Sequence, residues 1–523
     1  MTRPATAIGA GLAAARLARP IRAGERIHVV GAAGAGASGA ALLAHGASAV
    51  VTGCDAGGGS PYTVALAAEG VAVIQGHSPD HVTVQPMPGR LAVSKAITAV
   101  DPDNAELRAA RRLGIVLEPW QQLVADAAAD RTLVGVAGTH GKSTTAGWLV
   151  HLLVAAGADP SAFVGALLPS SLTGGPPATA RRGRGAAFVV EADEYAGNFD
   201  PYRPAVAVVT SAEWDHPDVF ADRGAVIEAL ARWLEAAAAD GEPPILVANV
   251  ADPGVEALVA RLRAWPGTVL ATAVVDVSPQ RLAGFARGAA EHYATAGGPA
   301  RSLLGRIVAS EPAGTTIEVT GLDPLAGPLH VRLPTAGRHN ASNALGVAGA
   351  ALVLGQRAAS IRDGLATFPG VGRRLERKGE AAGVVVYDDY GHHPTAIRET
   401  LRAVRQREPG RRVWAVYEPL TYHRTAALLD DFAESLATAD AVAIADIWAG
   451  RDPDTTIASA AGLAEAVAGA RPGLEVAAPG SVEETAGWLA RHVRPGDAVL
   501  VMGGGQSYRI GELLLEHLVE RAS

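Results

Sequence analysis

The chain has 523 residues, which is long enough for about three domains that each bury their own core. Its formal net charge of -8, with 19% charged residues, argues against a nucleic-acid-binding surface. Cys54 is the single cysteine, so an internal disulfide is excluded and a reducing cytoplasm is expected. With 5% aromatic residues and 61 glycines, the composition favours an α/β protein with cores of Val, Leu, Ala and Ile.

The first 24 residues have the small apolar character of a secretion signal but contain no full apolar span. Arg16, Arg19 and Arg22 interrupt the apolar run, which predicts a short helix or a loose tail over residues 1–24. No other stretch reaches about 18 uninterrupted apolar residues, so no membrane span is expected. Beyond this tail, three blocks alternate short apolar runs with Ala/Leu-rich helical patterns, which is typical of parallel α/β sheets.

The first block opens with "RIHVVGAAGAGASGAALLAHGASAVVTGCD", which has the pattern of a dinucleotide-binding turn. A strand leads into Gly34, Gly36 and Gly39, which satisfy G-x-G-x-x-G, and the next strand ends on Asp55. Such glycines let a diphosphate approach the backbone at a helix N-terminus, and the acid is placed to meet a ribose or a base. The ligand stays open between a nicotinamide cofactor, a flavin and a nucleotide carried by the substrate. A tight turn without a ligand is the other interpretation.

The second block contains "GVAGTHGKSTTAGWLV", residues 135–150. The strict P-loop pattern fails because Val136 stands where its first glycine belongs, yet a buried strand, a glycine turn and a helix follow one another. Backbone N–H groups at the helix start would face an anion. Lys142 could then reach terminal phosphates, and the Ser143 hydroxyl is placed to bind Mg²⁺. The alternative is an ordinary glycine-rich turn.

Polar residues end two later strands of this block, "AAFVVEADE" and "AVAVVTSAEWDH": Glu191, Asp193, Glu194, Asp215 and His216. Because the carboxyl ends of parallel strands meet at one sheet edge, we expect these side chains beside the phosphate loop. Glu191 offers Mg²⁺ a hard oxygen ligand, and neutral His216 could bind a second metal or orient the substrate. Asn340 and Asn343 flank the start of a later helix, where Asn is usually a cap.

The third block repeats the arrangement of polar strand ends, with Asp388, Asp389, His392 and His393 before a helix. Zinc is conceivable, but consecutive histidines rarely converge on one ion. Three arginines could clamp phosphates or carboxylates, and surface solvation is the alternative: Arg373, Arg374 and Arg424.

In this order, "GTHGKSTT", "EADE", "GRHNASNA", "GVGRRLE" and "DDYGHHPTAI" resemble the motifs of the Mur ligase family of peptidoglycan synthesis. The resemblance spans about residues 27–505, and the combination is far more specific than any one motif. It implies an α/β fold with a Rossmann-like UDP-binding domain, a central P-loop ATPase-like domain and a C-terminal Rossmann-like domain. The expected ranges are 1–127, 128–358 and 359–523.

The resemblance also implies a reaction and its residues. Such ligases use ATP and Mg²⁺ to phosphorylate a carboxylate, and an amine then attacks the acyl phosphate. The motifs are most similar to the members that join L-alanine to UDP-N-acetylmuramate, which would make this chain a cytoplasmic monomer or homodimer. The implied catalytic residues are Lys142, Glu191, His216 and Arg424. The implied metal ligands are Ser143, Glu191 and His216. The implied ATP contacts are Gly138, Thr139, His140, Gly141, Lys142, Ser143, Thr144, Asn340, Asn343, Arg373, Asp388 and Asp389. The implied substrate contacts are Gly34, Gly36, Ser38, Gly39, Asp55 and His393.

The stretch "YEPLTYHRT", residues 417–425, departs from the family pattern. Leu420, Thr421 and His423 stand where His, Arg and Ser are usual. The added group is therefore open between alanine and the whole tripeptide that the family's recycling ligases attach. A dinucleotide-dependent oxidoreductase would use the first glycine turn but leave "GTHGKS" and the strand-end acids without a role. A scaffold that kept only the fold would tolerate loss of Lys142 or Glu191, and both are present.

Overall fold

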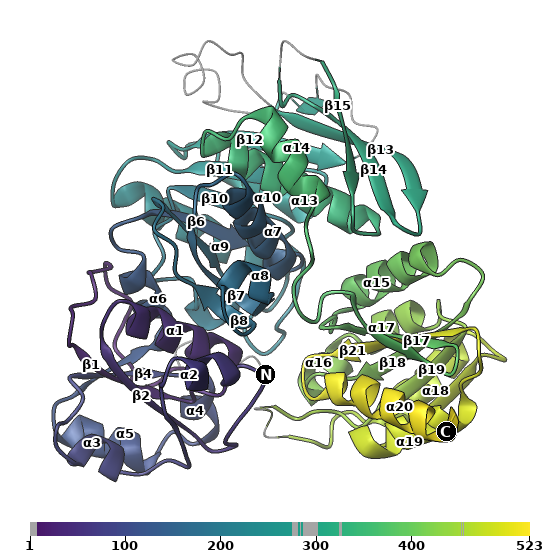
Figure 1. Ribbon diagram of the computed structural model, residues 1–523, viewed down its shortest axis with the longest axis horizontal. Coiled ribbons are helices and arrows are strands. Elements are labelled where there is room, and N and C mark those ends of the chain that lie inside the picture. Colours follow the sequence, from purple (N-terminus) through teal and green to yellow (C-terminus); the bar gives the residue numbers. More distant parts are fainter. Residues whose placement is uncertain are drawn as a thin grey trace.

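The computed structural model describes residues 8–274, 281–282, 284–285, 302–323, 327–450, 452 and 454–522. These residues form three sheets, which lie in chain order in three α/β domains arranged around a common centre (Figure 1). The α/β class and the three-domain organisation expected from the sequence are confirmed. All strands of each sheet fall within one of the ranges 1–127, 128–358 and 359–523.

The N-terminal domain is a parallel five-stranded sheet of order β3-β2-β1-β4-β5. Its strands are β1 (Arg26–Val30), β2 (Val50–Asp55), β3 (Val73–Gln75), β4 (Arg90–Val93) and β5 (Val116–Pro119). Its helices are α1 (Ala35–Gly46), α2 (Val64–Ala68), α3 (Asp80–Thr83), α4 (Lys95–Val100), α5 (Ala105–Arg112) and α6 (Trp120–Ala127). This strand order is Rossmann-like, as the glycine turn between β1 and α1 indicated.

The central domain has a ten-stranded sheet of order β15-β14-β13-β12-β11-β10-β6-β9-β7-β8. Its strands are β6 (Thr132–Ala137), β7 (Ser161–Leu168), β8 (Ala178–Arg181), β9 (Ala187–Glu191), β10 (Val206–Val209), β11 (Ile245–Asn249), β12 (Thr268–Val274), β13 (Leu303–Glu311), β14 (Gly314–Thr320) and β15 (Leu329–Leu333). Its helices are α7 (Lys142–Ala155), α8 (Ser170–Thr173), α9 (Arg223–Ala239), α10 (Pro253–Arg261), α13 (Arg338–Val353) and α14 (Ala358–Ala366). The interior strands are parallel and buried on both faces, which explains their continuous apolar runs. Strands β13 to β15 and strand β8 pair antiparallel at the two edges.

The C-terminal domain has a six-stranded sheet of order β16-β17-β21-β18-β19-β20, parallel except for β16. Its strands are β16 (Glu376–Ala381), β17 (Val384–Asp389), β18 (Arg412–Glu418), β19 (Ala441–Ala445), β20 (Glu475–Gly480) and β21 (Asp497–Gly503). Its helices are α15 (Pro394–Arg407), α16 (Tyr422–Ala427), α17 (Leu429–Leu436), α18 (Ala460–Ala470), α19 (Val482–His492) and α20 (Ser507–Ala522).

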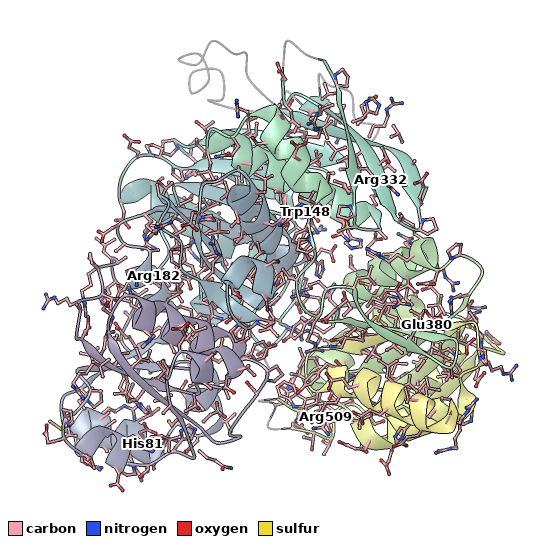
Figure 2. The ribbon with its side chains drawn as sticks, viewed as in Figure 1. His81, Trp148, Arg182, Arg332, Glu380 and Arg509 are labelled. Carbon is pink, nitrogen blue, oxygen red and sulfur yellow. The ribbon has the colours of Figure 1, made fainter. Side chains whose placement is uncertain are left out.

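Helix α14 begins at Ala358, at the expected domain boundary, and packs in the central domain. Ile361 and Leu365 are fully buried there in the same cluster as Trp148 of α7. Trp148, which Figure 2 labels in the central domain, stacks on the ring of Phe368, with centroids 4.6 Å apart. The domain boundary at residue 358 stays a prediction. The hydrophobic core of the central domain includes Ile361, Leu365 and Phe368, which follow that boundary in the chain.

In its described part, residues 8–24, the N-terminal segment forms turns and irregular backbone rather than the short helix that was one expectation, and it is hydrogen-bonded to the first domain rather than loose. Arg16 anchors it, because its guanidinium lies 2.7 Å from Asp126 and 3.1 Å from Glu118. Arg90 of β4 contacts the same two carboxylates from inside the domain. Among the residues that the structure describes, no helix combines the length and the apolar character that crossing a bilayer requires.

Candidate active site

The turn between β6 and α7 holds the predicted phosphate-binding residues. Gly138 and Gly141 have φ values of 123° and 79°, which favour glycine because a Cβ clashes with the backbone there. The Thr139 hydroxyl donates to the Glu213 carbonyl, and the His140 amide donates to the Ser211 hydroxyl. Helix α7 begins at Lys142 without a side-chain cap. The loop after β10 therefore holds the turn in place, and the first backbone N–H groups of α7 remain available to bind an anion.

Lys142 is held by two carboxylates from the end of β9. Its Nζ lies 3.1 Å from Glu194 Oε2 and 3.6 Å from Asp193 Oδ1, and its side chain is 13% exposed. Burial opposes the charge on Lys142, but the carboxylates of Glu194, Asp193 and Glu191 outweigh it and raise the pKa. Burial also raises the pKa of Glu194 to about 7. Lys142 is therefore a fixed cation at the mouth of the turn.

Ser143 and Glu191 lie side by side. The Ser143 hydroxyl donates to Glu191 Oε1 at 2.9 Å, and the Gly165 amide donates to Glu191 Oε2 at 2.6 Å. Arg374, from the C-terminal domain, donates to Ser143 Oγ at 2.7 Å. A hydroxyl and a carboxylate next to a phosphate-binding turn are ligands of the kind that Mg²⁺ takes, so these residues fit that ion.

His216 occupies a different part of the site. One of its ring nitrogens lies within 4.8 Å of carboxylate oxygens of Asp193 and Glu194, and its grouping with Ser143 and Glu191 as metal ligands stays a prediction. Burial lowers the pKa of His216, so its imidazole is neutral at pH 7. The guanidinium of Arg424 lies 3.2 Å from His216 Nδ1. His216 is thus oriented from the C-terminal domain.

Arg424 also forms a buried ion pair between two domains. Its Nε lies 2.8 Å from Asp215 Oδ1, and both side chains are 5% exposed. Although burial opposes ionisation, Arg424 holds the pKa of Asp215 well below its usual value. The arginine that remains in "YEPLTYHRT" is therefore committed to the central domain.

Asn340 and Asn343 of α13 face the phosphate-binding turn. The helix is capped by Gly337, so neither Asn is the N-cap that their position favoured. The side-chain Nδ2 of Asn343 donates to Asn340 Oδ1 at 3.2 Å, and the side-chain Nδ2 of Asn340 donates to the Ala336 carbonyl. A Cβ on Gly141 would collide with Asn343 Oδ1. These contacts bring the predicted adenine-binding residues against the turn.

In the C-terminal domain, Arg373, Asp388 and Asp389 pair mainly within their own domain. Arg373 Nε lies 3.0 Å from Asp388 Oδ2, and its Nη2 donates to the Ser507 hydroxyl. Asp388 is fully buried, and this burial raises its pKa to about 6. Asp389 accepts the amides of Leu375 and Gly391. The two aspartates therefore shape the loops that carry Arg373 and Arg374.

His393 caps helix α15 and contacts the central domain. Its Nδ1 accepts from the Thr395 amide, and its Nε2 lies 3.2 Å from the Trp214 carbonyl oxygen. The ring centroids of His393 and His140 are 4.7 Å apart. Glu213, which the sequence interpretation missed, lies 3.3 Å from His140 Nε2 and accepts from the Thr395 hydroxyl. Its signal was its place two residues before Asp215 at the same strand end.

The glycine turn of the N-terminal domain divides into two parts. Gly34 begins α1, and the neighbouring Ala33 amide donates to Asp55 Oδ2 at 3.1 Å. Gly36 lies against the Trp120 indole, and a Cβ on Gly39 would lie 2.7 Å from Thr179 Oγ1 and 2.9 Å from the Phe163 ring. Ser38 is buried and donates to the Ala35 carbonyl. The structure therefore places Gly34 and Asp55 at a cavity, and Ser38 and Gly39 in the contact with β7 and β8.

Two neighbouring cavities connect these residues. The larger has a volume of about 1340 Å³, and its walls come from all three domains, including Gly34, Asp55, Thr144, Asn340, Arg373 and Asp389. The second has a volume of about 610 Å³ and includes Gly36, Lys142, Ser143, Glu191, His216 and Arg424. Both include His140 and Gly141. The phosphate-binding turn therefore separates a nucleotide-sized space from a space lined by the metal-type ligands.

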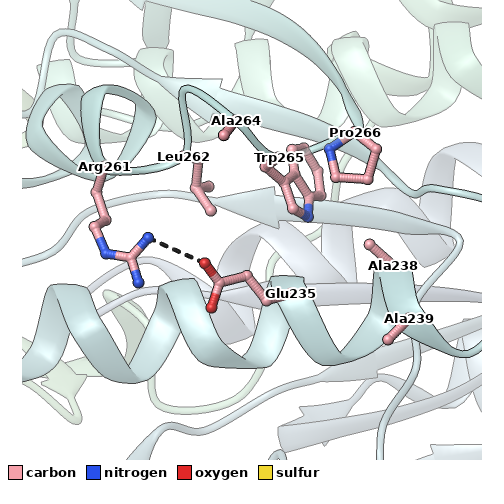
Figure 3. Close-up of a pocket in the computed structure, with 8 residues that line it drawn as sticks. All are labelled: Glu235, Ala238, Ala239, Arg261, Leu262, Ala264, Trp265 and Pro266. Atoms are coloured by element: carbon pink, nitrogen blue, oxygen red, sulfur yellow. Dashed lines mark hydrogen bonds and ion pairs between the residues drawn. The ribbon is translucent and has the colours of Figure 1, made fainter.

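A further hollow of about 330 Å³ lies beside α9 and α10 (Figure 3). Its walls are mostly alanines, leucine and proline, with one ion pair between Arg261 and Glu235 at 3.0 Å. Strand-end acids and glycine turns are not among its lining residues. It has no chemistry in common with the site.

Comparison with known proteins identifies the family of the chain. Three family profiles match in order: "Mur ligase family, catalytic domain" over residues 26–132, "Mur ligase middle domain" over 136–351 and "Mur ligase, glutamate ligase domain" over 373–505. A UDP-N-acetylmuramate–L-alanine ligase of Kineococcus radiotolerans is 37% identical, covering 95% of this chain and 97% of that protein. The UDP-N-acetylmuramate–L-alanine ligase of Acidothermus cellulolyticus is 36% identical, covering 96% of this chain and 97% of that protein.

Solved structures show the same fold. The UDP-N-acetylmuramate-alanine ligase of Thermotoga maritima matches with a TM-score of 0.72 at 21% identity, over 95% of this chain and all of that one. A murein peptide ligase of Psychrobacter arcticus matches with a TM-score of 0.67 at 25% identity, over 95% and 99%. The family profiles and the relatives make this three-domain chain an ATP-dependent ligase that forms a C–N bond. The chain belongs to the Mur ligase family.

Proposed function

We propose that this chain joins L-alanine to the carboxylate of UDP-N-acetylmuramate in peptidoglycan precursor synthesis, at the expense of ATP and through an acyl phosphate. The observation that carries the proposal is the uncapped start of α7, with Lys142, Ser143 and Glu191 at the junction of two cavities. The names of the relatives that match over 95% of the chain supply the substrates. We place the reaction in the cytoplasm and expect a monomer or homodimer.

The chemistry begins with ATP in the larger cavity, where Asn340 and Asn343 line the wall beside the turn. The amides at the start of α7 and Lys142 would bind the phosphates, and Lys142 would exchange its contact with Glu194 for the terminal phosphate. Mg²⁺ on Ser143 and Glu191 would neutralise charge that develops on the transferring group. Arg374 reaches Ser143 from the C-terminal domain, so that domain completes the site.

The substrate carboxylate would occupy the smaller cavity beside Lys142 and His216. The N-terminal domain would hold the UDP diphosphate at the amides around Gly34, with Asp55 on the same wall. Closure of the three domains would exclude water from the acyl phosphate, which water hydrolyses. Ser38 and Gly39 would support this closure by letting α1 approach β7 and β8 of the central domain closely, while Gly36 lets α1 pack on Trp120 of its own domain.

A second candidate is the attachment of a whole tripeptide to UDP-N-acetylmuramate. It is favoured by the likeness to a murein peptide ligase and by Leu420 and Thr421, which line the smaller cavity where the family pattern has His and Arg. A tripeptide is larger than alanine and carries more charged groups, so the smaller cavity would need different lining residues to bind it.

Phosphate release from ATP tests the proposal directly. The enzyme is given Mg²⁺ and UDP-N-acetylmuramate, with L-alanine, glycine, L-serine or L-Ala-D-Glu-diaminopimelate in parallel, and products are identified by mass. Alanine-dependent release with the matching UDP product is the expected result. Release with the tripeptide only would assign the second candidate, and no release with any acceptor would contradict both.

A further inference from the structure

A cluster of metal-type side chains lies in the N-terminal domain, and none of its residues lines either of the two cavities. His28 is on β1, Cys54 on β2, His81 on α3 and Glu106 on α5. His81 lies at the outer end of that domain (Figure 2). The cluster sits between the sheet and the helices α3 and α5, beside the core that Val30, Val82 and Leu107 form.

The four ligand atoms have the spacing of a coordination shell. One nitrogen, oxygen or sulfur atom from each residue lies within 4.8 Å of the others. Cys54 Sγ is 3.3 Å from Glu106 Oε2, His81 Nδ1 is 3.3 Å from the same oxygen, and His28 Nε2 is 2.9 Å from Glu106 Oε1. Tetrahedral zinc with bonds of about 2.0–2.3 Å separates its ligand atoms by about 3.3–3.8 Å.

The polar atoms of the cluster are buried and contact one another. His28, Cys54 and Glu106 are at most 1% exposed, and His81 is 10% exposed. Among the described residues, the polar contacts of His28 Nε2, His81 Nδ1 and Glu106 Oε1 are the ion-pair contacts within the cluster itself. A buried group of two imidazoles, a thiol and a carboxylate that contact mainly one another is the donor set that zinc takes.

The ring of His28 is already oriented for a metal. Its Nδ1 lies 2.8 Å from the Thr52 hydroxyl, on the neighbouring strand, while Nε2 points into the cluster. A hydrogen bond at the outer nitrogen of this kind fixes the tautomer and the ring plane of metal-binding histidines. A further histidine, His77, lies 3.2 Å from Cys54 Sγ at the rim and is not one of the four residues of the cluster.

We propose that this cluster is a structural site for Zn²⁺, bound by His28 Nε2, Cys54 Sγ, His81 Nδ1 and a carboxylate oxygen of Glu106. On binding, the thiol of Cys54 loses its proton to solvent and the thiolate forms the sulfur–metal bond, with no change in oxidation state. Thiolate and carboxylate together balance the charge of the ion. Four protein ligands leave no open position, which is the character of a structural zinc rather than a catalytic one.

Bound zinc would cross-link two strands and two short helices of the N-terminal domain. Helix α3 is a single turn, Asp80–Thr83, which has little stability by itself. Cys54 immediately precedes Asp55, whose carboxylate holds the Ala33 amide at the cavity wall. The ion would therefore fix the end of β2 from the side opposite the substrate.

The experiment uses the full chain, purified without chelator, with the metal content measured by mass spectrometry and Co²⁺ titrated into the metal-free protein. Because Cys54 is the only cysteine, a thiolate-to-Co²⁺ charge-transfer band can arise only from this site. We expect about one Zn²⁺ per chain and such a band for the wild type. Cys54→Ser should lose the band, and Cys54→Ser, His81→Ala and Glu106→Gln should each bind zinc at least about tenfold more weakly.

Two controls separate this site from other histidines. His517→Ala, on an exposed part of α20, and His393→Asn, in the histidine group near the phosphate-binding turn, should keep the zinc and the band. If Cys54→Ser does not fold, His81→Ala at the rim replaces it, and its zinc affinity should be at least about tenfold lower than that of the wild type. Absence of the band from the wild type, or zinc that remains in the His81 and Glu106 variants, would overturn the proposal.

Discussion

At the scale of single residues, the charge of Lys142 is stabilised by carboxylates that a phosphate would replace. Lys142→Ala should therefore reduce ATP-dependent phosphate release by about 10²-fold or more, since one preorganised electrostatic contact supplies that order of transition-state stabilisation. Lys142→Arg keeps the charge but not its compact geometry, and we expect it to recover little activity. The measurement is the initial rate of phosphate release at saturating substrates.

Arg261→Ala is the control, because Arg261 pairs with Glu235 and Glu228 at the exposed surface of α9 and α10. It should leave the rate within about twofold, since surface ion pairs contribute little. Circular dichroism should show that the Lys142 variants fold. Near-normal phosphate release by Lys142→Ala would remove Lys142 from the proposed mechanism.

His393 makes stability depend on pH. Burial and the nearby His140 lower the pKa of His393 to about 4. The unfolded chain binds this proton below about pH 6.5 and the folded chain only below about 4, so stability falls as the pH falls through this window. The contribution is up to about 3 kcal/mol. His393→Asn keeps a capping oxygen for α15 without a titrating ring.

We expect urea midpoints of the wild type to decrease more steeply between pH 6.5 and pH 4 than those of His393→Asn. The comparison is made by tryptophan fluorescence at constant ionic strength. Thr395→Ala, which removes only the hydroxyl bond to Glu213, should keep the wild-type slope. Equal slopes in wild type and His393→Asn would show that this ring titrates normally.

At the scale of elements, the two ends of α7 offer a matched pair of glycines. Gly141 and Gly157 have φ values of 79° and 77°, but only Gly141 has a neighbour, Asn343 Oδ1, where a Cβ would go. Gly157→Ala should cost about 1 kcal/mol from backbone strain alone, and Gly141→Ala more than that. Only Gly141→Ala should also lower phosphate release, as the turn shifts. Urea denaturation and the phosphate assay check both, and equal effects would contradict the assignment of the turn.

The elements that carry the clearest periodicity could be predicted from the sequence. The strand and helix around "GTHGKS" are β6 and α7, because a short apolar run, glycines and a long apolar helix leave little alternative. Strand β10 ends at Val209, so the acids up to His216 lie in a loop rather than on the strand. The antiparallel strands β13 to β15 had no assignment, although each pairs with the next strand along the chain, because their buried residues alternate with more exposed ones instead of forming the continuous apolar runs of the parallel strands.

At the scale of the whole molecule, one buried ion pair connects the central and C-terminal domains. Removing Arg424 leaves Asp215 buried without its partner, which costs about 3–5 kcal/mol. Arg424→Met together with Asp215→Asn should cost less than the sum of the single changes. Arg405→Ala breaks an exposed pair with Asp440 inside one domain and should cost less than about 1 kcal/mol. Thermal unfolding of the wild type, the two single variants and the double variant measures the coupling between Arg424 and Asp215. Strictly additive effects of the two single changes would contradict this coupling.

The same scale explains which parts of the site could be predicted. Lys142, Ser143 and Glu191 follow adjacent strands of one sheet, so general rules for parallel sheets place them together. Arg374 was recognised as basic, but its contact with Ser143 joins residues 231 positions apart in different domains. Local patterns carry no information on how separate domains meet. The contact between Glu213 and Thr395 could not be predicted for the same reason, since Thr395 belongs to the C-terminal domain.

The enclosed position of the single cysteine has a practical consequence for observing domain motion. Cys54 is 0% exposed, so maleimide dyes should not react with it in the folded protein. A pair of cysteines added to exposed positions of two domains could therefore be labelled without first removing the native thiol. Energy transfer between the two dyes would report the distance between the domains as nucleotide and substrate are added.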